Sequence, residues 1–197
     1  MNRNTPKFTA CLLAGGKSSR MGRDKALIEL NGVLLWRHQV SLLQQTGAAE
    51  ILVSGRRDLP GEAGGEIRFI SDEAAGRGPL SGVHAALGAA LHPLVLVLAI
   101  DTPMMTSLYL RELIARAFET DRGVVPQRDG CYEPLASVYP VRARKIAVTA
   151  LHGQDFSMQY FVGECVRQNL VDPLAIFDSD AELFRNLNTA GDLMGIS

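Results

Sequence analysis

Short apolar runs alternate along the chain with longer amphipathic segments, and this alternation is the main clue to the fold. Apolar runs of roughly four to eight residues are typical of buried strands, whereas longer segments with apolar positions three and four residues apart are typical of helices. The predicted strands cover residues 8–13, 50–54, 67–70, 94–100, 123–126 and 135–139. The predicted helices cover residues 34–45, 80–91, 109–118, 141–151 and 158–168.

Strands that alternate with helices predict a parallel sheet covered by helices on both faces. We therefore expect an α/β fold with three layers, αβα, and a mostly parallel sheet. No internal repeat or low-complexity linker breaks the pattern, and 197 residues, of which 47% are hydrophobic, are enough for a single domain spanning residues 1–197. The glycine-rich segment 55–65 is expected to form a surface loop rather than a domain boundary.

Composition excludes several classes of protein. The chain carries 20 basic and 21 acidic residues, so a nucleic-acid partner, which needs a surface with excess Lys and Arg, is not expected. Cys11, Cys131 and Cys165 are far apart and form no C-x-x-C pair, so neither a zinc site nor a disulfide framework is expected and a cytoplasmic location fits. No apolar run approaches the ~20 residues needed to cross a bilayer, so no membrane partner is expected.

A glycine-rich loop follows the first predicted strand. It contains two adjacent glycines and four cations, namely Gly15, Gly16, Lys17, Arg20, Arg23 and Lys25. Glycines let backbone N–H groups approach phosphate oxygens, and cations neutralise the charge of a leaving phosphate. A Walker A loop would need glycine where Cys11 stands, and the G-x-G core of the dinucleotide fingerprint is missing. The pattern predicts a different triphosphate-binding loop, and the alternative is a solvated basic loop.

The most apolar predicted strand ends in a carboxylate, Asp101. Ligands of open α/β sheets bind outside the carboxyl ends of strands, and Mg²⁺ prefers one or two carboxylates together with waters and phosphates. Asp101 is therefore a candidate metal ligand. The alternative is that Asp101 caps the turn before the helix that starts near Thr106.

Residues 12–25, LLAGGKSSRMGRDK, resemble the signature LAGGxSxRMGxDK of the molybdenum cofactor guanylyltransferases, the MobA family of the nucleotidyltransferases. Every specified position of the signature is present, and the resemblance extends from about Cys11 to Leu193. It implies a Rossmann-like nucleotide-binding sheet of the nucleotide-diphospho-sugar transferase type. It also implies that the N-terminal half binds the nucleotide and the C-terminal half binds the acceptor.

The resemblance assigns roles to individual residues. The implied nucleotide-binding residues are Leu13, Ala14, Gly15, Gly16, Lys25, Ser54, Asp72, Gly78, Gly82 and Asp101. Lys25, assisted by Arg20, is expected to stabilise the pyrophosphate, and Asp101 is expected to hold Mg²⁺, the implied cofactor. Without the GPLSG motif that follows it, Asp72 would be interpreted as a solvated turn carboxylate. Ser54 stands where the family often has Asn, and its hydroxyl reaches less far than an amide.

Two segments bear on the acceptor. CYEPLASVY, residues 131–139, is similar to the family's EPLxAxY stretch and makes Glu133 a candidate acceptor-binding residue, whereas Tyr139 is as compatible with a core position as with a ligand contact. NLNTA, residues 186–190, resembles the family's NxNTP and makes Asn186 and Asn188 further candidates. A purely structural role, in which Thr189 caps a final helix, would also explain this second segment.

The implied activity is transfer of GMP from GTP to the terminal phosphate of molybdenum-bearing molybdopterin, with release of pyrophosphate. GTP and molybdopterin are then the substrates, and transient contacts with cofactor-synthesis and insertion proteins are implied. The related cytidylyltransferases usually read LAAG where this chain has Leu13 to Gly16, which favours GTP over CTP. The alternatives are a cytidylyltransferase, a sugar-phosphate nucleotidyltransferase or a regulator that binds nucleotide without catalysis.

Overall fold

The computed structural model describes residues 6–15, 25–55, 59–60, 66–71 and 77–187. The strands of its main sheet are β1 (Thr9–Leu13), β4 (Glu50–Ser54), β5 (Ile67–Ile70), β6 (Leu94–Ala99), β7 (Gly123–Arg128), β8 (Cys131–Tyr132), β9 (Ala136–Pro140) and β10 (Val171–Ala175). Two very short strands, β2 (Glu29–Leu30) and β3 (Val33–Leu34), form a separate antiparallel hairpin.

The main sheet is mostly parallel, as the sequence predicts. Its order is β10-β7-β9-β6-β1-β4-β5, and β8 pairs with β7 outside this path. β1 lies between β4 and β6 and is parallel to both, β4 is parallel to β5, and β7 is parallel to β10. β9 is reversed, because it pairs antiparallel with β6 and β7. The chain therefore enters β9 at the edge where it leaves β6.

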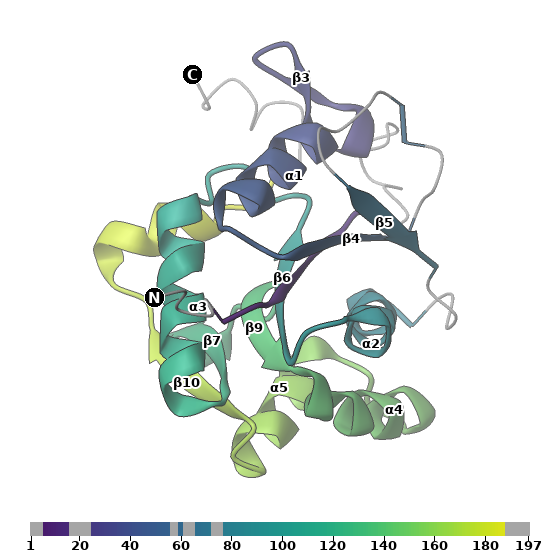
Figure 1. Ribbon diagram of the computed structural model, residues 1–197. Helices are drawn as coiled ribbons and strands as arrows, with labels where there is room; N and C mark the ends of the chain where they lie inside the picture. The colour runs from purple at the N-terminus through teal and green to yellow at the C-terminus, as the bar shows by residue number, and fades with distance from the viewer. Residues whose placement is uncertain (1–5, 16–24, 56–58, 61–65, 72–76, 188–197) are drawn as a thin grey trace, which may run out of the picture.

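Helices cover both faces of this sheet, which confirms the three-layer fold (Figure 1). On one face lie α1 (Leu35–Gln45) and α3 (Ser107–Thr120), and on the other lie α2 (Pro79–Ala89), α4 (Arg144–His152) and α5 (Met158–Arg167). Short 3₁₀ segments add η1 (Lys25–Leu27), η2 (Val141–Ala143) and η3 (Asp178–Phe184).

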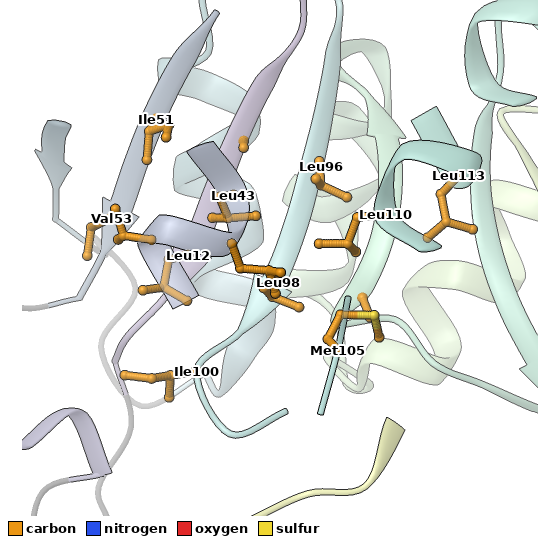
Figure 2. Packing of buried hydrophobic residues seen from close by; sticks show 14 of the residues in the cluster. Leu12, Leu43, Ile51, Val53, Leu96, Leu98, Ile100, Met105, Leu110 and Leu113 are labelled. Carbon is orange, nitrogen blue, oxygen red and sulfur yellow. The ribbon is translucent and has the colours of Figure 1, made fainter. Parts of the chain in front are cut away.

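Each face of the sheet has its own apolar core. Along β1, Leu12 joins the cluster beneath α1 and α3, whereas its neighbour Leu13 joins the cluster beneath α2, α4 and α5. Figure 2 shows the first cluster, in which Leu98 of β6 lies close to Leu43 of α1, with Leu110 of α3 farther along the same layer. A strand buried on both faces needs apolar side chains at every position. This explains why the central strands stand out in the sequence as unbroken apolar runs.

Helix ends differ from the prediction by small, explicable amounts. α2 ends at Ala89 rather than at residue 91, and Ala90 already has extended backbone angles, because the chain must turn through Pro93 before it enters β6. The predicted helix 141–151 begins as the 3₁₀ segment η2 before it continues as α4. The pattern of apolar residues in the sequence does not predict the β2–β3 hairpin or β10.

Glu50 ties four segments together at the amino-terminal edge of the central strands. Its carboxylate accepts hydrogen bonds from Thr9 Oγ1 (2.7 Å), from the Leu91 N–H (2.9 Å) and from Arg68 Nη2. Arg68 also donates to the Ala89 carbonyl. Burial alone would raise the pKa of Glu50, but the donors from Leu91, Thr9 and Arg68 outweigh it and lower that pKa below its ordinary value.

Neither a membrane-spanning helix nor a disulfide occurs in the described part of the chain. No helix there is long and apolar enough to cross a bilayer. Cys11, Cys131 and Cys165 form no disulfide; Cys11 and Cys165 are buried, and Cys131 is exposed. Burial raises the pKa of Cys165 to about 12, so this thiol stays protonated and unreactive at neutral pH.

Candidate functional site

The carboxyl ends of β1, β4 and β6 meet at one edge of the sheet, where several predicted nucleotide-binding residues gather. Leu13, at the end of β1, is in register with Ser54 of β4 and Ala99 of β6. The contact continues beyond the strands, because the Ala14 N–H donates to the Ser54 carbonyl over 3.0 Å and the Ile100 N–H donates to the Leu13 carbonyl over 3.2 Å. Open α/β sheets bind ligands at this edge.

Lys25 and Asp101 form an ion pair at this edge. Lys25 Nζ lies 2.8 Å from Asp101 Oδ2, although the two residues are 76 positions apart in the sequence. Lys25 begins η1 after the glycine-rich loop, and Asp101 follows β6 by two residues. Their side chains are 19% and 27% exposed, so both remain accessible from solvent. The structure thus brings together the cation predicted for phosphate and the carboxylate predicted for metal.

A buried amide holds the turn that presents Asp101. Gln39 of α1 is fully buried, and its Nε2 donates to the Thr102 carbonyl over 2.8 Å and to the Ile100 carbonyl over 3.4 Å. From the other side, the Leu187 N–H donates to the Asp101 carbonyl over 2.7 Å. The backbone around Asp101 is therefore fixed both by α1 and by the segment that follows η3.

Asp101 is not the residue that caps the helix after it. The cap of α3 is Thr106, whose Oγ1 accepts a hydrogen bond from the Tyr109 N–H over 3.3 Å. The Asp101 carboxylate instead pairs with Lys25. Because Thr106 caps α3, the Asp101 carboxylate is available to interact with a ligand at the sheet edge.

The backbone at Gly55 touches the backbone of the glycine-rich loop. Gly55 has a φ of +114°, and a Cβ placed on it would lie 2.5 Å from Gly15 Cα and 2.6 Å from Gly15 N. A side chain at Gly55 is thus excluded twice, by its own backbone angles and by the neighbouring loop. Beside this contact, the Ser54 side chain is buried, whereas Gly15 is exposed.

The start of α2 also reaches the site. Gly78 precedes the helix with a φ of 65° and a ψ of −159°, a combination that essentially only glycine adopts. Pro79 follows at the first helical position, as expected, because its fixed φ suits that position. Gly82 lies one turn later and is buried. Gly78 and Pro79 line the cavity beside the sheet edge, and Gly82 does not.

A cavity of about 660 Å³ opens beside Asp101. It lies between the start of α2, the ends of β6 and β8, the start of β9 and the segment between α4 and α5. Besides Gly78, three other predicted site residues line it: Asp101, Glu133 and Asn186. Residues far apart in the sequence are therefore assembled around one volume, of a size typical of small-molecule sites.

Glu133 enters this cavity from the turn that precedes β9. Its backbone is fixed, since its N–H donates to the Pro126 carbonyl over 2.8 Å and its carbonyl accepts from Ser137 Oγ over 2.7 Å. Burial raises the pKa of the Glu133 carboxyl above its ordinary value. Tyr139, in contrast, is fully buried and donates its hydroxyl to the Pro134 carbonyl over 2.7 Å, so it belongs to the core.

Two pairs beside the cavity were not predicted from the sequence. The guanidinium carbon of Arg77 lies 5.0 Å from the ring centre of Phe156, which links the start of α2 to the segment before α5. Gln159 of α5 accepts from the Tyr132 N–H over 3.1 Å and donates to the Tyr132 carbonyl over 2.8 Å. No local pattern marks these pairs, because tertiary packing alone brings them together. Gln39 had a signal, since it is polar but occupies the apolar stripe of its helix.

Four of the predicted site residues lie outside the described residues. These are Gly16 and Arg20 of the glycine-rich loop, Asp72, and Asn188 near the end of the chain. Thr189, the predicted cap of a final helix, lies outside them too.

The chain is similar to known proteins over most of its length. Residues 10–165 match the model of the MobA-like NTP transferase domain. A probable molybdenum cofactor guanylyltransferase from Opitutus terrae is 34% identical over 98% of this chain and 96% of the relative. A molybdenum cofactor guanylyltransferase from Pseudomonas syringae pv. syringae is 31% identical over 98% of this chain and 94% of the relative.

Two solved structures show how widely the fold is shared. Molybdopterin-guanine dinucleotide biosynthesis protein A from Archaeoglobus fulgidus superposes with a TM-score of 0.73 at 24% identity, covering 95% of this chain and 96% of the other. A 4-diphosphocytidyl-2C-methyl-D-erythritol synthase from Anaerococcus prevotii gives 0.70 at 13% identity and covers 96% of each chain. At these identities the likeness shows the fold alone. The family is shown by the domain match and by the sequence relatives: the chain belongs to the MobA-like NTP transferases.

Proposed function

We propose that the protein is a molybdenum cofactor guanylyltransferase, which transfers GMP from GTP to the terminal phosphate of molybdenum-bearing molybdopterin. The observation that carries this proposal is the Lys25–Asp101 pair at the carboxyl edge of the sheet, beside a cavity of about 660 Å³. The names of the relatives from Opitutus terrae and Pseudomonas syringae support the same activity.

In the proposed reaction, an oxygen of the acceptor's terminal phosphate attacks the α-phosphorus of GTP. The bond between the α-phosphorus and the oxygen that leads to the β-phosphate breaks, and pyrophosphate leaves. The acceptor phosphate is already anionic at neutral pH, so the enzyme needs no general base, only positioning and charge neutralisation. Lys25, assisted by Arg20, would neutralise the leaving pyrophosphate, and the backbone N–H groups of Gly15 and Gly16 would donate to phosphate oxygens.

The remaining predicted residues divide between the two substrates. For the nucleoside we propose Leu13 and Ala14 at the end of β1, Ser54 at the end of β4, and the Asp72, Gly78 and Gly82 segment. For the acceptor we propose the residues of the C-terminal half: Glu133, Asn186 and Asn188. Asp101, between the two groups, would face the phosphate that is transferred.

Mg²⁺ is the proposed cofactor, and the donors present fit it. Mg²⁺ prefers one or two carboxylates and completes its coordination with waters and substrate phosphates. In the described ranges no three His, Cys, Asp or Glu side chains gather into a protein cage, whereas Asp101 offers one partly exposed carboxylate. Asp101 would hold the ion, and the chemistry supplied when it is bound would be polarisation of the phosphoryl oxygens.

Pyrophosphate release tests the proposed function. The assay would contain the purified protein, Mg²⁺ and molybdopterin-loaded acceptor, with GTP, CTP, ATP and UTP in parallel. We expect release with GTP alone. A preference for CTP would contradict the role given to Gly15 and Gly16, and release only with a sugar phosphate as acceptor would identify a sugar-phosphate nucleotidyltransferase. GTP binding without release under any condition would identify a regulator.

The same proposal implies a cellular location and partner proteins. We propose a cytoplasmic enzyme that meets the proteins supplying molybdopterin and those inserting the finished cofactor only transiently. Cys11, Cys131 and Cys165 form no disulfide, which is compatible with a reducing compartment.

A further inference from the structure

The cavity beside Asp101 combines an aromatic wall with a small set of polar groups. Phe156, Tyr132 and Phe184 supply the aromatic part, and Glu133 and Asn186 are among the polar residues. Such a mixture is suited to a flat heterocycle that needs both contact area and hydrogen bonds at its edge. The cavity can therefore bind a ring system as well as a phosphate group.

Phe156 is the best-placed platform for a flat ligand. Its side chain lines the cavity and the residue is 37% exposed, so part of its apolar surface is accessible to a ligand. The Arg77 guanidinium lies over the ring at 5.0 Å. This contact restrains the ring and links it to the turn that ends in Gly78.

Glu133 contributes a half-buried carboxylate to this cavity. Its carboxylate is half-buried, and among the described residues no hydrogen bond or ion pair to it occurs, whereas Asp155 in the same wall accepts from the Ser157 N–H over 2.8 Å. A half-buried carboxylate without donors is unfavourable, and a ligand with adjacent N–H groups would relieve it. The fixed backbone of Glu133 holds the start of its side chain at a defined place beside the cavity.

We propose that Glu133 is a specificity-determining residue that accepts hydrogen bonds from the 2-amino and N3–H groups of a pterin ring lying against Phe156. The proposal rests on the proposed function, because molybdopterin carries such a ring. Two adjacent ring donors match the two oxygens of one carboxylate, as in other bidentate pairs.

Guanine also carries a 2-amino group next to a ring N–H, so the guanine of GTP could bind the same carboxylate. The position of the cavity favours the pterin. Of the described residues proposed for the nucleoside, Gly78 lines the cavity, but Leu13, Ala14, Ser54 and Gly82 do not. The segments around Tyr132 and Phe156 of the C-terminal half form most of it. We therefore assign the carboxylate to the acceptor.

Binding of a simple pterin tests the assignment without catalysis. The intrinsic fluorescence of 6-hydroxymethylpterin would be titrated with the full-length protein, beside 6-hydroxymethyllumazine, whose oxo group replaces the 2-amino group. We expect the pterin to bind about tenfold more tightly, equivalent to about 1.4 kcal/mol. Glu133→Gln should abolish this preference, and Phe156→Leu should weaken both ligands. Asp155→Asn is the matched control, because that carboxylate already has a donor, and it should keep the preference.

Steady-state kinetics show whether Glu133 binds the pterin of the acceptor or the guanine of the nucleotide. Glu133→Gln should raise the KM for molybdopterin about tenfold and leave the KM for GTP within about twofold. A rise in the KM for GTP instead would assign Glu133 to guanine and overturn the proposal. Equal binding of pterin and lumazine by the unaltered protein, or no binding of either, would overturn it as well. Absence of GMP transfer would contradict the proposed function alone, since the fluorescence preference does not depend on turnover.

Discussion

The Lys25 ammonium lies on the Asp101 carboxylate, 2.8 Å away, so the cation proposed for pyrophosphate and the carboxylate proposed for Mg²⁺ neutralise each other in this structure. The two side chains are 19% and 27% exposed, so the cost of desolvating both charges offsets part of their attraction and leaves a small net contribution to stability, about 1 kcal/mol. The pair therefore has little value for the fold. We propose that ligand binding explains its position at the carboxyl edge of β6.

Asp101→Asn and Lys25→Met should separate activity from stability. Each change removes one charge that would act on phosphate or metal, and we expect kcat for pyrophosphate release to fall about 10²-fold or more. The free energy of unfolding should change by less than about 1 kcal/mol. Pyrophosphate release and urea denaturation measure the two quantities. Activity within tenfold of the unaltered protein in Asp101→Asn would contradict its role.

Gln39→Leu should destabilise the turn that carries Asp101. The change removes the amide donor to the Thr102 and Ile100 carbonyls. Leaving buried carbonyls without a donor costs about 1–3 kcal/mol, so the free energy of unfolding should fall by that amount. We also expect kcat to fall, because Asp101 loses its support.

Gln45→Leu is the control for this change, since Gln45 lies at the end of the same helix and is exposed. It should alter neither quantity. If Gln39→Leu were as stable and as active as Gln45→Leu, the proposed support of the turn would be wrong.

Gly55→Ala should disturb nucleotide binding through the backbone of Gly15. The new Cβ would lie 2.5 Å from Gly15 Cα, so one of the two loops must move. We expect the Kd for GTP, measured by isothermal titration calorimetry, to rise about tenfold or more, which corresponds to about 1.4 kcal/mol.

Gly47→Ala distinguishes this clash from backbone strain. Gly47 also has a positive φ, +83°, but a Cβ on it would meet nothing within 4 Å. Its substitution should lower stability by about 1 kcal/mol, as expected for a strained left-handed residue, and leave GTP binding unchanged. Equal Kd values for the two variants would show that Gly55 does not control the loop.

Glu50→Gln should show a pH-dependent loss of stability. The pKa of Glu50 is lowered in the folded protein by its donors, so the folded state favours the charged carboxylate. This contribution to stability is present above the pKa of the unfolded chain and is lost as the pH falls through the lower, folded pKa. Urea denaturation should therefore show a larger deficit for Glu50→Gln at pH 7 than at pH 3.

Glu112→Gln serves as the reference for that experiment. Glu112 pairs with Arg116 on an exposed helix face, where both side chains are about half exposed, and its loss should cost less than about 1 kcal/mol. A deficit for Glu50→Gln that is the same at both pH values would mean that charge contributes nothing to the Glu50 cluster.

The sequence predicts the central strands and the packed helices because their apolar residues follow the pattern of each element: an unbroken run in a buried strand, and a spacing of three and four residues in a helix. β6 is apolar at every position, and α1 carries its apolar stripe. The β2–β3 hairpin has a signal, Asn31-Gly32, both with positive φ, but its strands are too short to show alternation. β10 contains Pro173, which is typical of edge strands and weakens the strand pattern.

The site divides in a similar way. Lys25, Asp101 and Gly78 could be predicted because each belongs to a motif whose residue types serve one kind of chemistry. The contact of Arg77 with Phe156 could not, since neither side chain is distinctive and their meeting depends on how the segment before α5 packs against the start of α2. The sequence therefore predicts Asp101, Glu133 and Asn186 one by one as site residues, but the packing that gathers them around one cavity is visible only in the structure.

The reversed direction of β9 gives the two substrates different evolutionary freedom. Because the chain enters β9 beside Asp101, the turn that carries Glu133 lines the same cavity as Asp101 without belonging to the parallel strands β1, β4 and β6. Substitutions or insertions in that turn leave the register of those strands intact. A lineage with this fold can therefore exchange its acceptor while inheriting its nucleotide machinery unaltered.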